Sequence, residues 1–258
     1  MVAIRPFVRH RTDGSFSGLK YGRAMPTPRI VACGGSLFDE EAVSLHHFIL
    51  SLARQPNPRV CFLPTATGDH PEAVARFYRF AARMDCRPSD LPLFQREVDD
   101  LETFLMEQDV VWVSGGNTAN MLAVWRVHGL DRILHAAWES GCVMTGASAG
   151  MNCWFEASVT DSFSVHSLAA LDDGLGWLAG SACPHYDGEE MRRPTYRQLV
   201  AGGFPAGIAA EDGVGVVYEG TERVDVVSWR ADAAAWLVSR SPDADGAVSE
   251  ERVSARPV

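Results

Sequence analysis

Short apolar runs alternate along the chain with stretches whose apolar residues recur at helical spacing. Four such runs predict buried strands, at residues 29–33, 59–63, 109–113 and 142–145. Four amphipathic stretches predict helices, at residues 39–54, 71–84, 118–127 and 131–140. Because strands of a parallel sheet are covered on both faces, they read as continuous apolar runs separated by helices. The pattern predicts an α/β fold, a mostly parallel sheet flanked by helices.

The pattern changes after about residue 204. Short strand-like runs with Gly, Asp and Glu turns follow, at residues 208–210, 214–218, 224–227 and 234–238, and they predict an antiparallel C-terminal edge of the same sheet. Residues 25–240 are expected to form a single domain. Residues 1–24 are polar and aperiodic and predict a flexible extension, with Met25 as a candidate start. The tail, residues 241–258, is rich in Asp, Glu, Ser and Pro and is expected to be frayed.

Composition narrows the classes of function. With 23 basic and 33 acidic residues, the chain has a formal charge of −10, which argues against a nucleic-acid partner. No apolar stretch is long enough to cross a membrane, so no membrane partner is expected. The six cysteines form no C-x-x-C pair, which favours a reduced, cytoplasmic location. Metal ligands at a recognised spacing and phosphate-binding loops are absent from the sequence, so no metal or cofactor is expected.

Small and hydroxyl-bearing residues follow the four predicted strands, as GGS (34–36), PTATG (64–68), SGGNT (114–118) and GASAG (146–150). Ligands of parallel sheets bind at this end of the strands. The last loop is a G-x-S-x-G motif between a strand and a helix, which is typical of a nucleophile elbow with Ser148 as nucleophile. Alternatively, Ser148 merely caps the helix that follows.

An activated serine needs a base, a group that orients the base, and donors for the oxyanion. His185 follows the apolar run 178–184 and is the best candidate base, with His166 as its nearest rival. Three carboxylates could orient the imidazole, and we favour Asp161 or Glu156 over Asp187. A continuous helix would carry Glu156 about 12 Å from the elbow, so only a short helix would let it reach the base.

The oxyanion donors are expected to be backbone amides. Ala149 follows the nucleophile, and the glycine pair Gly115–Gly116 lets a second loop approach the substrate closely. The same loop could simply begin a helix capped by Asn117 or Thr118. Cys183 would share a strand face with the base, but a cysteine buried in a strand is usually inert.

Together these motifs resemble the peptidase E (S51) family of serine peptidases. The resemblance spans about residues 28–220. Its N-terminal part consists of Gly34-Gly35, the SGGNT loop, and GASAG followed by Cys153-Trp154-Phe155-Glu156. Its C-terminal part consists of Cys183-Pro184-His185-Tyr186-Asp187, Arg192-Arg193 and residues 207–213. It implies a flavodoxin-like, class I glutamine amidotransferase-like fold, with serine in place of the cysteine nucleophile. The best-known members are cytoplasmic dipeptidases that remove an N-terminal aspartate, and cyanophycinases are relatives.

The resemblance also implies roles for residues. Ser148 is the nucleophile and His185 the base; the family aspartate falls near Asp161, while relatives with a Ser-His-Glu triad keep Glu156 as the alternative. Substrate contacts are expected from Asn117 and Thr118, and from Arg192 and Arg193 because a guanidinium suits a substrate carboxylate. Equally, the two arginines could belong to a solvated helix face. At Ser114 the chain departs from the glycine of the peptidase E pattern, and the region after the base also differs. Both departures concern substrate preference.

The expected function is therefore a serine peptidase that acts on short peptides without a cofactor, with a preference for N-terminal Asp as one option. Two alternatives remain: another amide or ester hydrolase, such as a cyanophycinase-like enzyme, and a non-catalytic ligand-binding relative. The oligomeric state is left open, with a homodimer as one candidate.

Overall fold

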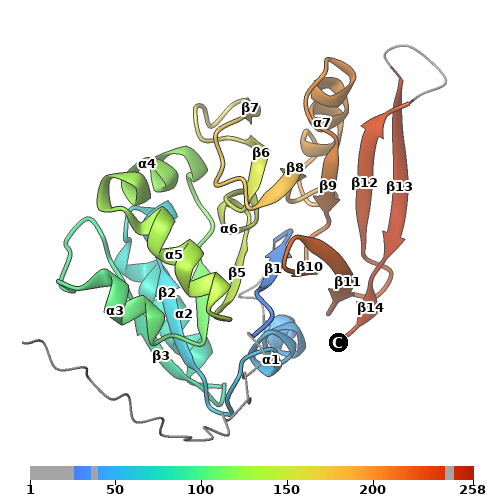
Figure 1. Cartoon of the computed structure of the whole chain (residues 1–258). Helices are drawn as coiled ribbons and strands as arrows, with labels where there is room; N and C mark the ends of the chain where they lie inside the picture. The colour runs from blue at the N-terminus through green and yellow to red at the C-terminus, as the bar shows by residue number, and fades with distance from the viewer. Residues whose placement is uncertain (1–25, 36–39, 242–246) are drawn as a thin grey trace, which may run out of the picture.

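The computed structural model describes residues 26–35, 40–241 and 247–258. The predicted extension, residues 1–24, and the candidate start Met25 lie outside the described residues, as does Ser36 of the first loop. Two sheets form the framework, and Figure 1 shows the smaller one beside the C-terminal part of the larger. In the described part of the chain, no helix is both long and apolar enough to span a membrane.

The first sheet has eight strands in the order β14-β11-β10-β1-β5-β4-β2-β3. Five strands at its centre and one edge are parallel: β1 (Arg29–Cys33), β5 (Val143–Ala147), β4 (Val110–Val113), β2 (Arg59–Leu63) and β3 (Arg87–Asp90). On the other side, β10 (Val214–Glu219) pairs antiparallel with β1, β11 (Glu222–Ser228) antiparallel with β10, and β14 (Arg256–Pro257) parallel with β11. The predicted, mostly parallel sheet with an antiparallel edge is confirmed.

Helices cover both faces of the parallel strands. One group comprises η1 (Glu40–Ala42), α1 (Val43–Ser51) and α2 (Pro71–Ala81), and the other α3 (Leu101–Met106), α4 (Thr118–His128) and α5 (Leu130–Glu139). Successive strand residues point to opposite faces: Val31 packs in a cluster with Leu45 of α1, whereas Ile30 packs in a cluster with Leu134 of α5. Figure 1 shows α3, α4 and α5 together on one side. Burial on both faces explains why these strands are apolar throughout.

The second sheet has six strands in the order β13-β12-β9-β8-β6-β7. Its strands are β6 (Phe155–Thr160), β7 (Ala169–Leu171), β8 (Leu178–Cys183), β9 (Gly207–Ala210), β12 (Ala234–Arg240) and β13 (Val248–Ser254). The helix α7 (Arg192–Ala201) joins β8 to β9. The expectation that all C-terminal strands continue one sheet is therefore wrong for β9 and β12. Apolar alternation predicts a strand but not its neighbour, and β9 pairs in parallel with β8.

One further expectation is corrected. Residues 248–254 and 256–257 of the predicted frayed tail are β13 and β14, and the partly buried Val248, Val253 and Val258 pack against the core clusters. A polar strand is stable there because its other side chains face solvent at a sheet edge. The helix after the elbow, α6 (Ala149–Asn152), is only four residues long, because β6 begins at Phe155.

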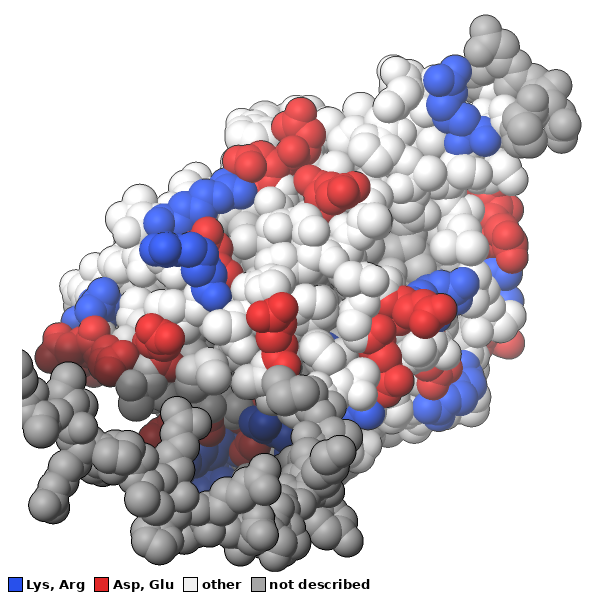
Figure 2. All heavy atoms as spheres, in the orientation of Figure 1, with Lys and Arg blue, Asp and Glu red and all other residues white. Residues whose placement is uncertain are grey.

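Opposite charges are interspersed on the surface. Figure 2 shows acidic and basic side chains close together on the face seen in Figure 1. Exposed ion pairs include Arg126–Asp173 at 2.7 Å and Arg256–Asp225 at 2.8 Å. Pairs of this kind contribute little to stability because solvent screens them.

Candidate active site

Ser148 lies on a strained turn between β5 and α6. Its backbone has φ 58° and ψ −112°, and a non-glycine residue held at positive φ costs about 1–3 kcal/mol. Both flanking glycines pack against β4: a Cβ added at Gly146 or Gly150 would lie 2.5 or 2.6 Å from the carbonyl oxygen of Val113. The Ser148 hydroxyl makes no capping hydrogen bond to α6. The geometry is therefore that of an elbow, not of a serine that caps a helix.

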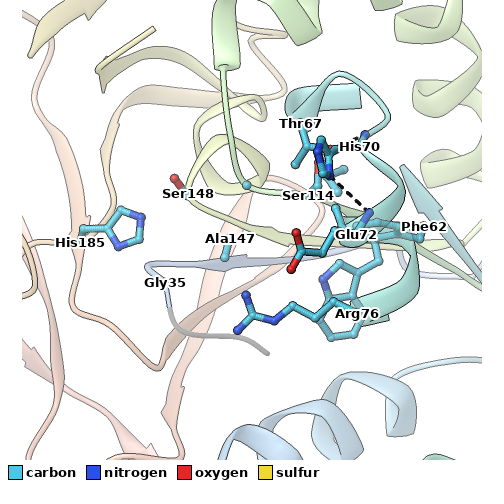
Figure 3. Close-up of a pocket in the computed structure, with 14 residues that line it drawn as sticks. Gly35, Phe62, Thr67, His70, Glu72, Arg76, Ser114, Ala147, Ser148 and His185 are labelled. Atoms are coloured by element: carbon cyan, nitrogen blue, oxygen red, sulfur yellow. Dashed lines mark hydrogen bonds between the residues drawn. The ribbon is translucent and has the colours of Figure 1, made fainter. Parts of the chain in front are cut away.

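The end of β1 brings the serine and the predicted base together. The amide of Ser148 donates to the carbonyl of Cys33, and the amide of His185 donates to the carbonyl of Gly34, each at 3.3 Å. Because these carbonyls belong to consecutive residues, the two donor residues must be neighbours. Both side chains line one cavity, and Figure 3 shows them beside each other at one end of it. Like Ser148, His185 has a positive φ, of 54°.

The carboxylate that contacts the imidazole is Asp212, in the loop between β9 and β10. His185 Nδ1 lies 2.8 Å from Asp212 Oδ1, and both side chains are about one-fifth exposed. The hydrogen bond from His185 lowers the pKa of the Asp212 carboxyl, and the positive charges of Arg230 and Arg192 add to this effect, while burial opposes it. The carboxylate is thus charged at neutral pH and holds the Nδ1 proton, which leaves Nε2 free to accept one.

The two carboxylates favoured from the sequence lie elsewhere. Glu156 is exposed on β6 and accepts a hydrogen bond from the amide of Gly180 at 2.8 Å. Asp161 is exposed just after β6. Neither has a hydrogen bond or ion pair to His185 among the described contacts. For Glu156 the expectation required a short helix after the elbow, and for Asp161 a return of the chain to the upper edge of the sheet. The helix is short, but β6 begins at Phe155 and the Glu156 carboxylate contacts the amide of Gly180, not the imidazole.

Asp187, the third carboxylate considered, contacts the backbone of Asp212. It accepts a hydrogen bond from the amide of Asp212 at 2.8 Å and does not contact the imidazole in the described hydrogen bonds. His166, the rival base, is exposed in the loop after β6 and does not line the cavity.

Sequence reasoning missed Asp212, although the chain offers a signal for it. Since β9 runs parallel to β8, with Ala209 opposite Cys183, the loops after both strands lie at the same edge of the second sheet. An acidic residue after β9 is therefore a neighbour of a histidine after β8. Assigning residues 208–210 to an antiparallel edge concealed this relation.

Gly115 approaches Ser148 closely. A Cβ added to it would lie 3.4 Å from Ser148 Cβ and 4.0 Å from Ser148 Oγ. Gly116 has φ 130° and packs against the carbonyl of Ala66, so this turn requires glycine. Among the described hydrogen bonds, none is donated by the amides of Gly115, Gly116 or Ala149. All three remain candidate oxyanion donors, and these contacts place Gly115 near the Ser148 hydroxyl.

Asn117 and Thr118 have structural partners and do not line the cavity. The Asn117 side chain caps α4 by accepting from the amide of Asn120 at 2.8 Å and donates to the carbonyl of Ser162. Thr118 is buried and lies 3.4 Å from the amide nitrogen of the Asn152 side chain. The loop thus begins a helix, as the alternative interpretation proposed.

The two arginines expected to bind substrate also lie outside the cavity. Arg192 is 2% exposed and donates to Glu189 and to the carbonyl of Val159. Arg193 lies 4.5 Å over the ring of Trp236 and pairs with Glu250 at 3.0 Å. Both guanidinium groups therefore join α7 to its surroundings.

The cavity that contains Ser148 has a volume of about 500 Å³. Phe62, Trp112 and Val113 form an apolar part of its wall, and Thr67, His70, Glu72 and Arg76 supply polar groups from η2 (Thr65–Thr67) and the start of α2. Figure 3 shows Thr67 and His70 at the end away from His185, with the side chains of Glu72 and Arg76 between them and His185. His70 also caps α2, because its Nδ1 accepts from the amide of Glu72 at 3.3 Å. No motif or spacing in the sequence singles out Glu72 or Arg76.

A cysteine nucleophile is a poor alternative. Burial raises the pKa of Cys183 to about 12 and that of Cys33 to about 12. Both thiols therefore stay protonated at neutral pH, and only the thiolate is a good nucleophile. The serine at the elbow is the better candidate.

Comparisons with known proteins show the family of the chain. The family model "Peptidase family S51" matches residues 30–226. The uncharacterized peptidase YgaJ of Bacillus subtilis (strain 168) is 46% identical over 213 residues, which cover 81% of this chain and 91% of the relative.

Solved structures show the same fold. A peptidase from an acI-B1 Actinobacterium aligns with a TM-score of 0.67 at 20% identity, over 90% of this chain and 96% of that one. A putative peptidase E protein from Listeria monocytogenes EGD-e aligns with a TM-score of 0.59 at 17% identity, over 80% and 99%. At these identities the comparison shows a shared fold. The chain belongs to peptidase family S51 and is a serine peptidase.

Proposed function

We propose that the protein hydrolyses short peptides, as a dipeptidase, through a triad of Ser148, His185 and Asp212. The observation that supports the proposal is the 2.8 Å contact between His185 Nδ1 and Asp212 Oδ1. His185 lines the same cavity as Ser148, whose backbone is strained. A partly buried carboxylate that orients an imidazole beside a serine at an elbow is the arrangement that activates a hydroxyl for acyl transfer.

In the proposed reaction, Ser148 Oγ attacks the carbonyl carbon of the peptide bond, and His185 Nε2 takes the hydroxyl proton. Asp212 keeps the proton of Nδ1 in place and stabilises the imidazolium that forms. The oxyanion is stabilised by amides at Gly115 and Ala149, with Gly116 as a further candidate donor. Collapse of the intermediate releases the amine, which takes the proton from His185. Water then cleaves the acyl-enzyme by the same steps in reverse order.

The size and polarity of the cavity support a small peptide as substrate. A volume of about 500 Å³ falls in the range of sites for small ligands. A dipeptide carries an ammonium group and a carboxylate, and Glu72 and Arg76 supply charges of the complementary signs in the same cavity. An N-terminal Asp would add a second carboxylate. We propose Arg76, in place of Arg192 and Arg193, as its partner.

A dipeptide panel tests the proposal. Asp-Leu, Asn-Leu, Ala-Leu and Lys-Leu are incubated with the wild type, with Ser148→Ala and with Ser51→Ala, a control in an exposed serine of α1. We expect the wild type and the control to release leucine, fastest from Asp-Leu, and Ser148→Ala to release none. Turnover by Ser148→Ala, or no turnover of any peptide by the wild type, would contradict the proposal. Hydrolysis of p-nitrophenyl acetate alone would favour the alternative of an ester hydrolase.

A further inference from the structure

Both backbone polar groups of Asp212 are held by one ion pair that lies outside the cavity. Asp187 Oδ1 accepts the hydrogen bond of the Asp212 amide at 2.8 Å. Arg230 Nη1 donates to the Asp212 carbonyl at 2.7 Å and to Asp187 Oδ2 at 2.9 Å. The aspartate and the arginine therefore hold each other and the peptide groups on both sides of Asp212.

The ion pair also connects the two loops that carry the base and its carboxylate. Asp187 lies two residues after His185, in the loop that follows β8, whereas Asp212 lies in the loop that follows β9. Arg230 comes from a third segment, just after β11, and its amide donates to Ser228 Oγ at 2.9 Å. Ser228 Oγ in turn donates to the carbonyl of Gly213 at 2.9 Å. A network of hydrogen bonds thus fixes Asp212 relative to His185.

Close packing restricts the Asp212 side chain as well. A Cβ added at Gly188 would lie 2.3 Å from Asp212 Oδ2, and one added at Gly35 would lie 2.0 Å from Asp212 Oδ1. The carboxylate therefore sits between two glycines with no room on either side. The backbone of the loop, which Asp187 and Arg230 hold, decides where Oδ1 points.

We propose that Asp187 and Arg230 act as a positioning pair, which sets the place of Asp212 against His185 and thereby the rate at which Ser148 reacts. This inference rests on the proposed function of the triad. Neither residue lines the described cavity, so neither is expected to contact the substrate. Their loss should lower the rate of the chemical step and leave the binding of the substrate unchanged.

Asp187 has a different role from the one that its place in the sequence suggests. It stands where the sequence offered a carboxylate two residues after the base, and the structure uses this carboxylate to hold the backbone of Asp212 instead of the imidazole. An exposed ion pair with no further role contributes little to stability, so replacing it should leave both the folded protein and its reaction rate unchanged. Replacing a positioning pair should slow the reaction of Ser148, because small displacements of reacting groups reduce rates strongly.

The rate of labelling by a fluorophosphonate probe tests the inference. The wild type, Asp187→Ala, Asp187→Asn and Arg230→Ala are mixed with the probe, and both the rate constant and the final fraction labelled are recorded. We expect Asp187→Ala and Arg230→Ala to react about 10-fold more slowly, with the same final fraction labelled. Asp187→Asn keeps an oxygen for the Asp212 amide and should recover part of the rate. On a dipeptide the loss should appear in kcat, not in KM.

Asp225→Asn is the matched control. Asp225 also accepts a backbone amide hydrogen bond, from Val226 at 2.9 Å, and also pairs with an arginine, Arg256. This variant should react at the wild-type rate.

The outcomes separate the inference from the proposed function. If the wild type is not labelled, the proposed function fails. If the wild type is labelled and the Asp187 and Arg230 variants react at its rate, the inference is wrong. It is also wrong if their slower reaction is matched by a lower final fraction labelled, since that result shows loss of folded protein. If Asp187→Ala does not fold, the rate constant and the final fraction labelled of Asp187→Asn and Arg230→Ala test the inference instead.

Discussion

Replacement of Asp212 should lower kcat and leave KM unchanged, because Asp212 orients His185 and does not line the cavity. The contact of 2.8 Å with His185 is a hydrogen bond to a charged group, which contributes about 1.5–3 kcal/mol. If that stabilisation is lost in the transition state, Asp212→Ala should lower kcat by about 10- to 100-fold, since each 1.36 kcal/mol is a factor of about ten.

Asp212→Asn should be worse than Asp212→Ala, although it is the smaller change in shape. The asparagine side chain can donate to His185 Nδ1, which places the ring proton on Nε2 and removes the acceptor that Ser148 needs. The same substitution in a serine protease triad lowers kcat by about 10⁴-fold for this reason. The order of the two variants therefore reports the tautomer of the base, whereas a merely structural role would predict the opposite order.

The assay is steady-state hydrolysis of a dipeptide, with kcat and KM determined separately for each variant. Glu156→Gln and Asp161→Asn serve as controls, because both carboxylates are exposed and have no described contact with the imidazole. We expect KM to stay near the wild-type value in both Asp212 variants, and both controls to keep full activity. Loss of activity in either control, together with active Asp212 variants, would refute the assignment.

Three other predictions follow from the geometry. Ser148→Gly should be more stable than Ser148→Ala by about 1 kcal/mol in chemical denaturation, because glycine tolerates the positive φ; equal stabilities would contradict the strain. Arg76→Ala should raise KM for Asp-Leu in steady-state kinetics, whereas Arg193→Ala should not, since only Arg76 lines the cavity; the reverse result would return Arg193 to the substrate site. A carboxyl whose pKa falls on folding adds stability that is complete above its unfolded-state pKa and is lost at lower pH. The difference in Tm between the wild type and Asp212→Asn should therefore shrink as pH falls from about 6 to about 3; an unchanged difference would show that the carboxylate is not stabilised in the folded state.

The parts of the fold that depend on local pattern were predictable. The strands β1 and β2 have the bounds expected from their apolar runs, because burial on both faces leaves a strong signal. The elbow was also predictable, since the small residues on both sides of Ser148 follow from the close approach of Val113. In each case a few adjacent residues contain the whole constraint.

The parts that depend on which strands are neighbours were not predictable in this way. Asp212 reaches His185 only because β9 joins the second sheet beside β8. The apolar pattern of β9 predicts a strand but does not indicate which strand it pairs with. Arg192 reads as an exposed helix residue, yet it is buried because Glu189 and the carbonyl of Val159 supply acceptors for it. Residues 71–84 read as an ordinary amphipathic helix, so the charges that α2 places on the cavity gave no separate signal.

The identity of the residue that reacts with a fluorophosphonate tests the central claim most directly. The labelled protein is digested, and the modified peptide is sequenced by mass spectrometry. The account predicts one modified residue, Ser148, and no labelling of a His185→Ala variant on the same timescale. Modification of a different serine, or labelling of Ser148 that does not depend on His185, would contradict it.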